Sequence, residues 1–236
     1  MTTFRIDDIG ASTKQFEQYS YYKWANFWFL KRLPYLKAWG PYKELSAKEW
    51  TILLDIFKKN SIKPIIAITA SWVEKNSSLT PFPKKFPHQA EILKRALKEG
   101  CIEIANHGLT HCVVGNHLPL LRHNNRRFHR EFWPELNEEI HTKHIKKSQE
   151  ILESYFDTPI ETFVPPGNVW SIKTYNALKN TNIKKIISSK YMLDSNMKIN
   201  DIKFINDNHS FFSFHDRELK LYGPKWLKNK IKEYDE

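Results

Sequence analysis

The chain has 236 residues, of which 41% are hydrophobic and 14% are aromatic, and only seven are glycine. This composition is typical of a single globular domain, and it excludes collagen-like, linker-rich and largely disordered chains. The net charge of +11 attracts anions, but the lysines are scattered along the chain, so charge alone does not select a partner.

Short apolar runs rich in β-branched residues predict strands, and they alternate with longer segments of helical spacing. The expected strands are Thr3–Ile6, Lys63–Thr69, Ile102–Ala105, Glu161–Val164, Lys184–Ser188, Ile202–Ile205 and Phe211–Phe214. The expected helices are Ser46–Asn60, Pro87–Glu99, Asn137–Phe156, Ser171–Asn180 and Pro224–Tyr234. This order predicts an α/β protein with an irregular (β/α)7-type barrel and an active site at the carboxyl ends of the strands.

We expect one catalytic domain over residues 1–236, with an aromatic-rich insertion at about 16–45 after the first strand. The aromatic rings of this insertion could stack on sugars at the mouth of the barrel or form a small core of their own. The N-terminal sequence places two acidic residues where an export signal needs an apolar run. No apolar run approaches the length of a membrane span, so we expect a cytoplasmic protein.

Polar residues follow several predicted strands, beginning with the first. Asp7 and Asp8 end that strand, and two adjacent carboxylates are costly to hold together unless a positive charge such as a metal ion is near. The same Asp-Asp-x-Gly run also forms ordinary turns. Alone, this pair therefore leaves a structural and a functional interpretation open.

The third predicted strand runs into His107 and His111. If the chain is helical there, residues four apart share one face and both imidazoles can reach one ion. Asp8 can supply a carboxylate to the same ion. Two histidines and one carboxylate leave coordination positions open for water and substrate, as a catalytic metal requires.

Three other histidines have less specific patterns. His215 ends the last predicted strand, where it is either a structural histidine or an acid–base catalyst. His141 and His144 form a second close pair, which we interpret as surface residues on a helix.

These elements, in this order, resemble the polysaccharide deacetylases of the NodB-homology group of carbohydrate esterases. The first motif of that family ends in Asp-Asp-Gly, where the first aspartate is the base and the second is a metal ligand. The resemblance implies these roles for Asp7 and Asp8, with Ile9 inserted before Gly10.

The second family motif, His-x-x-x-His, is matched by His107 and His111 and implies that both bind the metal. The last motif ends in a histidine that matches His215, which implies a general acid that protonates the leaving amine. The expected ion is zinc, with cobalt, nickel and manganese as alternatives.

The third family motif reads Arg-x-Pro-x-Gly, and here Phe163 stands where the arginine belongs. Arg5 lies two residues before Asp7 and points to the same side of the strand, so it is the candidate substitute. Glu131 is a candidate for a residue that supports the metal ligands. A backbone N–H for the oxyanion is expected in the loop of Pro166, Gly167 and Asn168.

The resemblance implies metal-dependent hydrolysis of an N-acyl group from a sugar, with N-acetyl as the favoured group. The positive charge and the expected compartment favour an anionic substrate, such as a nucleotide- or lipid-linked intermediate of surface polysaccharide or lipopolysaccharide synthesis. Such a substrate would place the protein at the inner face of the membrane, in contact with anionic lipid.

Three alternatives stay open. The same fold also carries deformylases and hydrolases of other small amides. A deacetylase that binds metal but has lost activity would be consistent with Phe163. A basic nucleic-acid-binding protein is disfavoured because its positive charge is not gathered into one stripe and because it leaves the strand-end polar residues unexplained.

Overall fold

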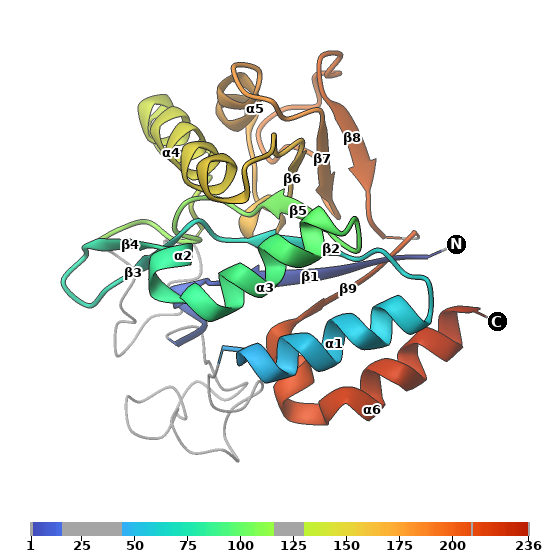
Figure 1. Ribbon diagram of the computed structural model, residues 1–236. Coiled ribbons are helices and arrows are strands. Elements are labelled where there is room, and N and C mark those ends of the chain that lie inside the picture. The colour runs from blue at the N-terminus through green and yellow to red at the C-terminus, as the bar shows by residue number, and fades with distance from the viewer. Residues whose placement is uncertain (1, 16–43, 116–129, 209, 236) are drawn as a thin grey trace, which may run out of the picture.

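The computed structural model describes residues 2–15, 44–115, 130–208 and 210–235 (Figure 1). Almost all of the aromatic-rich insertion predicted at about 16–45 lies outside these ranges, so its role and the single-domain arrangement stay predictions.

The strands of the described ranges form one seven-stranded parallel sheet and a separate two-stranded hairpin. The sheet order is β8-β7-β6-β5-β2-β1-β9. Its strands are β1 (Thr3–Ile9), β2 (Ile65–Ile68), β5 (Glu103–Asn106), β6 (Thr162–Phe163), β7 (Lys185–Ser188), β8 (Lys203–Asn206) and β9 (Phe211–His215). All seven predicted strands are confirmed. The sheet curls into a half-barrel with helices outside it, which confirms the irregular (β/α)7-type barrel (Figure 1).

The five predicted helices are also present: α1 (Ala47–Lys59), α3 (Pro87–Lys98), α4 (Glu138–Phe156), α5 (Ile172–Leu178) and α6 (Asp216–Asp235). The last one consists of two helical segments that meet at a kink, because Gly223 has a non-helical φ of 72°. The second segment corresponds to the predicted helix Pro224–Tyr234, and the break lies where Gly-Pro predicts it. The elements that were not predicted are all short: β3 (Ser71–Val73), β4 (Leu79–Pro81), α2 (Phe82–Lys85), η1 (Ser12–Gln15) and η6 (Pro166–Asn168).

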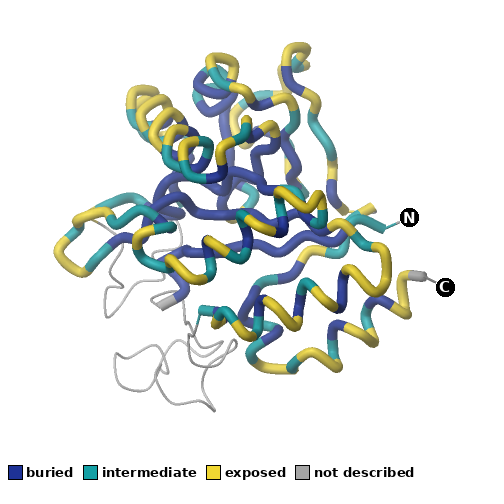
Figure 2. The backbone as a smooth tube through the Cα atoms, viewed as in Figure 1, coloured by how far each residue is buried: buried dark blue, intermediate teal, exposed yellow. Residues whose placement is uncertain are grey.

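Helices cover the sheet in two groups around two apolar clusters, and α4 contributes to both clusters. Helices α1, α3 and α6 pack on β1 and β2 around a large apolar cluster, whereas α4 and α5 pack together over β6 and β7. Helix α1 illustrates the cause: Ser46 and Glu49 form a reciprocal capping box at its start, and Trp50, Leu53 and Phe57 repeat at helical spacing on its buried face. Figure 2 shows this pattern as buried strands beneath helices with exposed outer faces.

The carboxyl end of β1, in the middle of the site, is irregular. Arg5 pairs with Ile65 and Ile6 with Ile66, but Ile9 pairs with Ile68, so three steps along β1 match two along β2. This is the signature of a β-bulge, which re-aims side chains near sites. The bulge contains Asp7 and Asp8, and Asp8 has a left-handed φ of 64°. Two neighbours that a regular strand would point to opposite faces can therefore both face one pocket.

Among the described helices, none combines the length and the apolar character that are needed to cross a membrane.

Candidate active site

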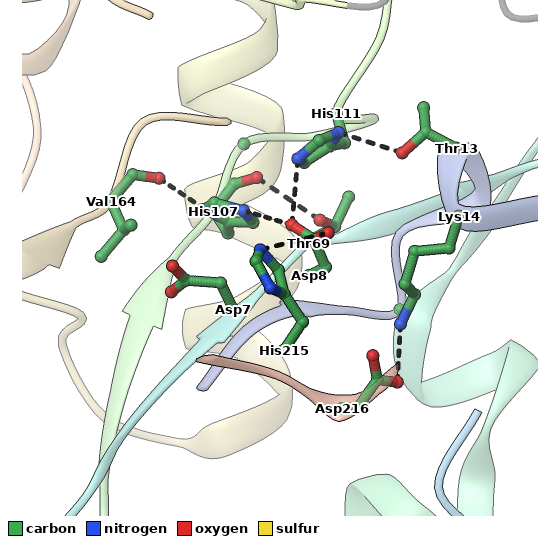
Figure 3. Close-up of polar contacts among 12 residues, drawn as sticks. Asp7, Asp8, Thr13, Lys14, Thr69, His107, His111, Val164, His215 and Asp216 are labelled. Carbon is green, nitrogen blue, oxygen red and sulfur yellow. Dashed lines mark hydrogen bonds and ion pairs between the residues drawn. The ribbon is translucent and has the colours of Figure 1, made fainter. Parts of the chain in front are cut away.

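Asp8, His107 and His111 converge at the carboxyl ends of β1 and β5 (Figure 3). Asp8 Oδ1 lies 3.2 Å from Nε2 of His107 and 3.1 Å from Nε2 of His111, and all three residues are buried. The other ring nitrogens are occupied, since His107 Nδ1 lies 2.7 Å from the Val164 carbonyl and His111 Nδ1 lies 3.0 Å from Thr13 Oγ1. This fits a metal site, because ligating histidines normally use one nitrogen for support and turn the other to the ion.

The two histidines do not reach this point from a helix. Residues 107–115 contain no helical turn, and His111 adopts a left-handed φ of 61°, three residues after Gly108 at a φ of 78°. The prediction that residues four apart share a helix face was therefore wrong in its reasoning. A tight loop rather than a helix brings the side chains together.

Glu131 lies beneath this loop and is 1% exposed. Its carboxylate accepts hydrogen bonds from the backbone N–H groups of Leu109, Thr110 and His111, at 2.8, 3.1 and 2.8 Å. Its Oε1 also lies 2.6 Å from Nδ1 of His144. Burial alone would raise the pKa of Glu131, but His144 and the backbone N–H groups outweigh it and hold that pKa below the ordinary value.

His141 and His144 are not the surface pair that the sequence predicted. His141 is fully buried, with contacts to the Thr174 hydroxyl at 3.0 Å and the Trp133 carbonyl at 3.2 Å, and burial lowers its pKa to about 4. His144 turns inward to Glu131. Both histidines lie on the inner face of α4, which the mixed polarity of that helix concealed.

Asp7 is held by Arg5 rather than by histidines. The guanidinium donates through Nε and Nη2 to the two oxygens of Asp7, both at 2.8 Å, and through Nη1 to Asp207 at 2.6 Å. Burial disfavours the charge of Arg5, but the two carboxylates outweigh it and raise the pKa of the guanidinium. Arg5 therefore has the contact with Asp7 that its sequence position predicted.

His215 and Arg217 face the second oxygen of Asp8. Asp8 Oδ2 lies 3.9 Å from His215 Nε2 and 3.3 Å from Arg217 Nη2. His215 Nδ1 lies 3.3 Å from Glu218 Oε2. Burial would lower the pKa of His215, but Asp8 and Glu218 raise it above the ordinary value. Burial would raise the pKa of Asp8, but His111, His215 and His107 outweigh it and hold that pKa well below its usual range.

These groups line one cavity of about 200 Å³. Arg130, Arg217, Val164 and Pro165 also line it. Of the predicted site residues, those on the cavity wall are Arg5, Asp7, Asp8, His107, His111, Gly167, Asn168 and His215. Glu131 and Pro166 do not line the cavity.

The loop after β6 has a narrower role than predicted. Pro166 has no N–H to donate, and the N–H of Asn168 is bonded to the Pro165 carbonyl at 3.0 Å. Gly167, at a φ of 59°, is left as the candidate donor of this loop.

A model of the polysaccharide deacetylase family matches residues 40–186, which is more than half of the chain. The chain belongs to the polysaccharide deacetylase family. The matched region contains His107, His111 and Glu131. Asp7, Asp8 and His215 lie outside it, on β1 and on its neighbour β9 at the edge of the sheet.

Solved structures of polysaccharide deacetylases are similar at low identity. A CE4-family pseudoenzyme from Bacillus anthracis is 13% identical, with a TM-score of 0.46 over 80% of this chain and 58% of its own. The deacetylase PplD of Streptococcus pyogenes is 13% identical, with a TM-score of 0.43 over 75% and 65%. The BpsB deacetylase domain of Bordetella bronchiseptica is 12% identical, with a TM-score of 0.45 over 72% and 69%.

This chain spans about three fifths of the first solved chains that it matches, at 58–60% of their length. No match was found among curated proteins.

In this member of the family, the residue at the position of the motif arginine belongs to the apolar core. Phe163 is fully buried, and its ring meets that of Phe132 edge-on at 5.5 Å. A guanidinium at this position would lose that packing. Asp7 pairs with Arg5 of β1, the residue that the sequence offered as a substitute, and whether Arg5 takes over the role of the family arginine stays a prediction.

Sequence reasoning missed two residues of the network. Asp207 directly follows β8, so the rule that selected Asp7 would have found it. Asp194, which lies before β8, accepts the Ile172 N–H at the start of α5 and does not line the cavity. No sequence signal identifies Arg217, because an arginine that follows a strand is usually interpreted as a surface residue.

Proposed function

We propose that this protein is a metal-dependent hydrolase that removes an N-acyl group from a sugar, with N-acetyl as the favoured group. One observation carries the proposal: Asp8, His107 and His111 converge in a cavity that also exposes a second carboxylate and a histidine. Membership of the polysaccharide deacetylase family supports the reaction class. Zinc is the proposed ion, because its usual ligands are imidazole nitrogens and carboxylate oxygens.

Asp7 is the proposed general base. A divalent ion held by Asp8 and the two histidines would supply Lewis-acid chemistry, lowering the pKa of water and polarising the acyl carbonyl. Asp7 accepts the proton of the attacking water through a free lone pair, since each of its oxygens keeps acceptor capacity beside its bond to Arg5. Arg5 fixes both oxygens and so orients the carboxylate toward the cavity.

His215 is the proposed general acid. Its side chain is 31% exposed at the cavity wall, and its Nδ1 lies 3.3 Å from Glu218 Oε2, a carboxylate outside the proposed metal ligands that stabilises the imidazolium form. It delivers a proton to the amide nitrogen as the C–N bond breaks, because an amine leaves poorly as an anion. The freed amino sugar then leaves as a neutral or protonated amine.

The substrate is proposed to carry an anionic group. Arg130 and Arg217 line the cavity, and the chain has a net charge of +11. Both features favour a phosphorylated N-acyl sugar, such as a nucleotide- or lipid-linked intermediate of surface polysaccharide synthesis. We place that reaction in the cytoplasm, at the inner face of the membrane, as part of the same proposal.

The test is an assay of zinc-loaded protein for acetate and formate release. The substrates are N-acetyl and N-formyl amino sugars, each as the free sugar and as its 1-phosphate. The proposal predicts acetate release with a higher kcat/KM for the phosphorylated sugar, and a raised KM for that sugar alone in Arg130→Gln. Formate release without acetate would identify a deformylase, and release of neither acid by metal-loaded protein would identify an inactive family member.

A further inference from the structure

The loop that carries the two histidines holds a conformation that its residues do not favour. His111 has a φ of 61°, and non-glycine residues lose roughly 1–2 kcal/mol in this region. Gly108, at a φ of 78°, tolerates it. Something outside the loop must therefore stabilise this shape.

The stabilising group is a carboxylate in a cup of backbone N–H groups. Leu109, Thr110 and His111 are consecutive, and all three donate to the side chain of Glu131. Successive N–H groups that point to one place form a concave anion site, usually filled by a phosphate or another ligand. Here the protein fills it with its own buried side chain.

Two further features show how closely Glu131 fits. A Cβ added to Gly108 would lie 2.2 Å from Glu131 Oε2, so only glycine lets the loop approach the carboxylate. On the other side, His144 of α4 lies 2.6 Å from Glu131 Oε1. The carboxylate is thus bonded both to the loop and to a helix of the scaffold, and its Oε1 contacts both.

We propose that Glu131 and His144 are positioning residues that hold His111 with its Nε2 toward Asp8, and thereby set the affinity of the metal site. The effect acts through the backbone: the His111 N–H is fixed by Glu131, while its ring is oriented by Thr13. Neither Glu131 nor His144 touches the substrate cavity. This inference rests on the proposed metal-binding function.

The experiment compares Glu131→Gln and His144→Ala with a matched control, Glu153→Gln. Glu153 also accepts a backbone N–H, from Ile160 at 2.9 Å, and bonds to side chains around it, but it lies on α4 away from the site. Zinc affinity is measured by competition with a chelator, thermal stability in parallel, and amide hydrogen exchange on metal-free protein.

We expect Glu131→Gln to weaken zinc binding about 10–100-fold, the usual effect of losing support for a metal ligand. The amides of residues 109–111 should exchange faster in that variant, even without metal. His144→Ala should weaken binding less, and His144→Gln, which keeps a donor, should recover part of it. Glu153→Gln should lose stability but keep wild-type zinc affinity.

Folded Glu131→Gln and His144→Ala with wild-type zinc affinity would overturn the inference. An affinity loss that simply follows thermal stability, and so appears equally in Glu153→Gln, would overturn it too. If Glu131→Gln does not fold, the two His144 variants decide. A wild type that binds no zinc would instead contradict the proposed function, whereas hydrogen exchange would still report whether Glu131 holds the loop.

Discussion

Asp7 and Asp8 are adjacent in the chain, yet their surroundings divide the site into two halves. Asp7 is paired through both oxygens with a permanent cation, Arg5. Asp8 Oδ1 faces the imidazoles of His107 and His111, which are neutral when they act as metal ligands, and only its Oδ2 meets a cation, Arg217, at 3.3 Å. The difference teaches that two adjacent carboxylates can take different roles according to the groups that hold them, since one guanidinium fixes both oxygens of Asp7 whereas one oxygen of Asp8 stays turned to two imidazoles.

The β-bulge makes this division possible. In a regular strand the two side chains would point to opposite faces, and only one would reach the cavity. The extra residue between Ile6 and Ile9 and the left-handed φ of Asp8 turn both side chains to the same pocket.

The largest loss of stability is expected from Arg5→Met, which removes the cation that pairs with Asp7. This change leaves Asp7 and Asp207 buried without their cation, and loss of one partner of a buried ion pair typically destabilises by about 3–5 kcal/mol. Urea denaturation should show a loss of this size. Arg5→Lys keeps the charge but not the paired geometry and should lose less. Full stability of Arg5→Met would contradict the assigned role.

The pH dependence of stability tests a buried group outside both halves of the site, His141. His141 lies away from Asp8, and its pKa of about 4 in the fold lies below the value of about 6.5 for an unfolded chain. Between these values the unfolded state binds the extra proton, so this contribution is complete above pH 6.5 and is lost as the pH falls toward 4. The loss reaches about 3 kcal/mol.

His141→Gln should remove this part of the acid sensitivity, because its amide can meet the same two partners without titrating. The measurement is the urea midpoint of both proteins from pH 7.5 to 4.5. Parallel curves for the two proteins would show that His141 is not held neutral in the fold.

The smallest effect is expected at a carboxylate outside both halves. Asp194→Ala removes one exposed bond to the start of α5, which is worth about 0.5–1.5 kcal/mol at most. Zinc content and acyl release should match the wild type. A loss of either would mean that the site extends beyond the cavity described above.

The sequence predicted the strands well because most of them are short apolar runs, and the inner ones are buried in the sheet, as in Ile65–Ile68. It also located most of the cavity wall, since parallel strands bring their carboxyl ends to one edge. The bulge was not predictable, because Asp7-Asp8 has the same letters in a regular strand or a turn. Nor was the pair of Arg5 with Asp207, which are 202 residues apart and meet only through the order of the sheet.

The histidine loop shows a different limit. A spacing of four suggested a helix, but the loop shape depends on Glu131, which is 20 residues beyond His111. Sequence spacing therefore selected two histidines that do meet in the structure, but for a wrong geometric reason.

The most direct test of the central claim is the metal content of Asp7→Asn beside that of Asp8→Asn, by elemental mass spectrometry after zinc loading. The account predicts about one zinc per chain in the wild type and in Asp7→Asn, with acyl release reduced roughly 10²–10⁴-fold in that variant. It predicts loss of the zinc in Asp8→Asn. Equal zinc content in the two variants, whether retained or lost, would contradict the division between a base and a ligand.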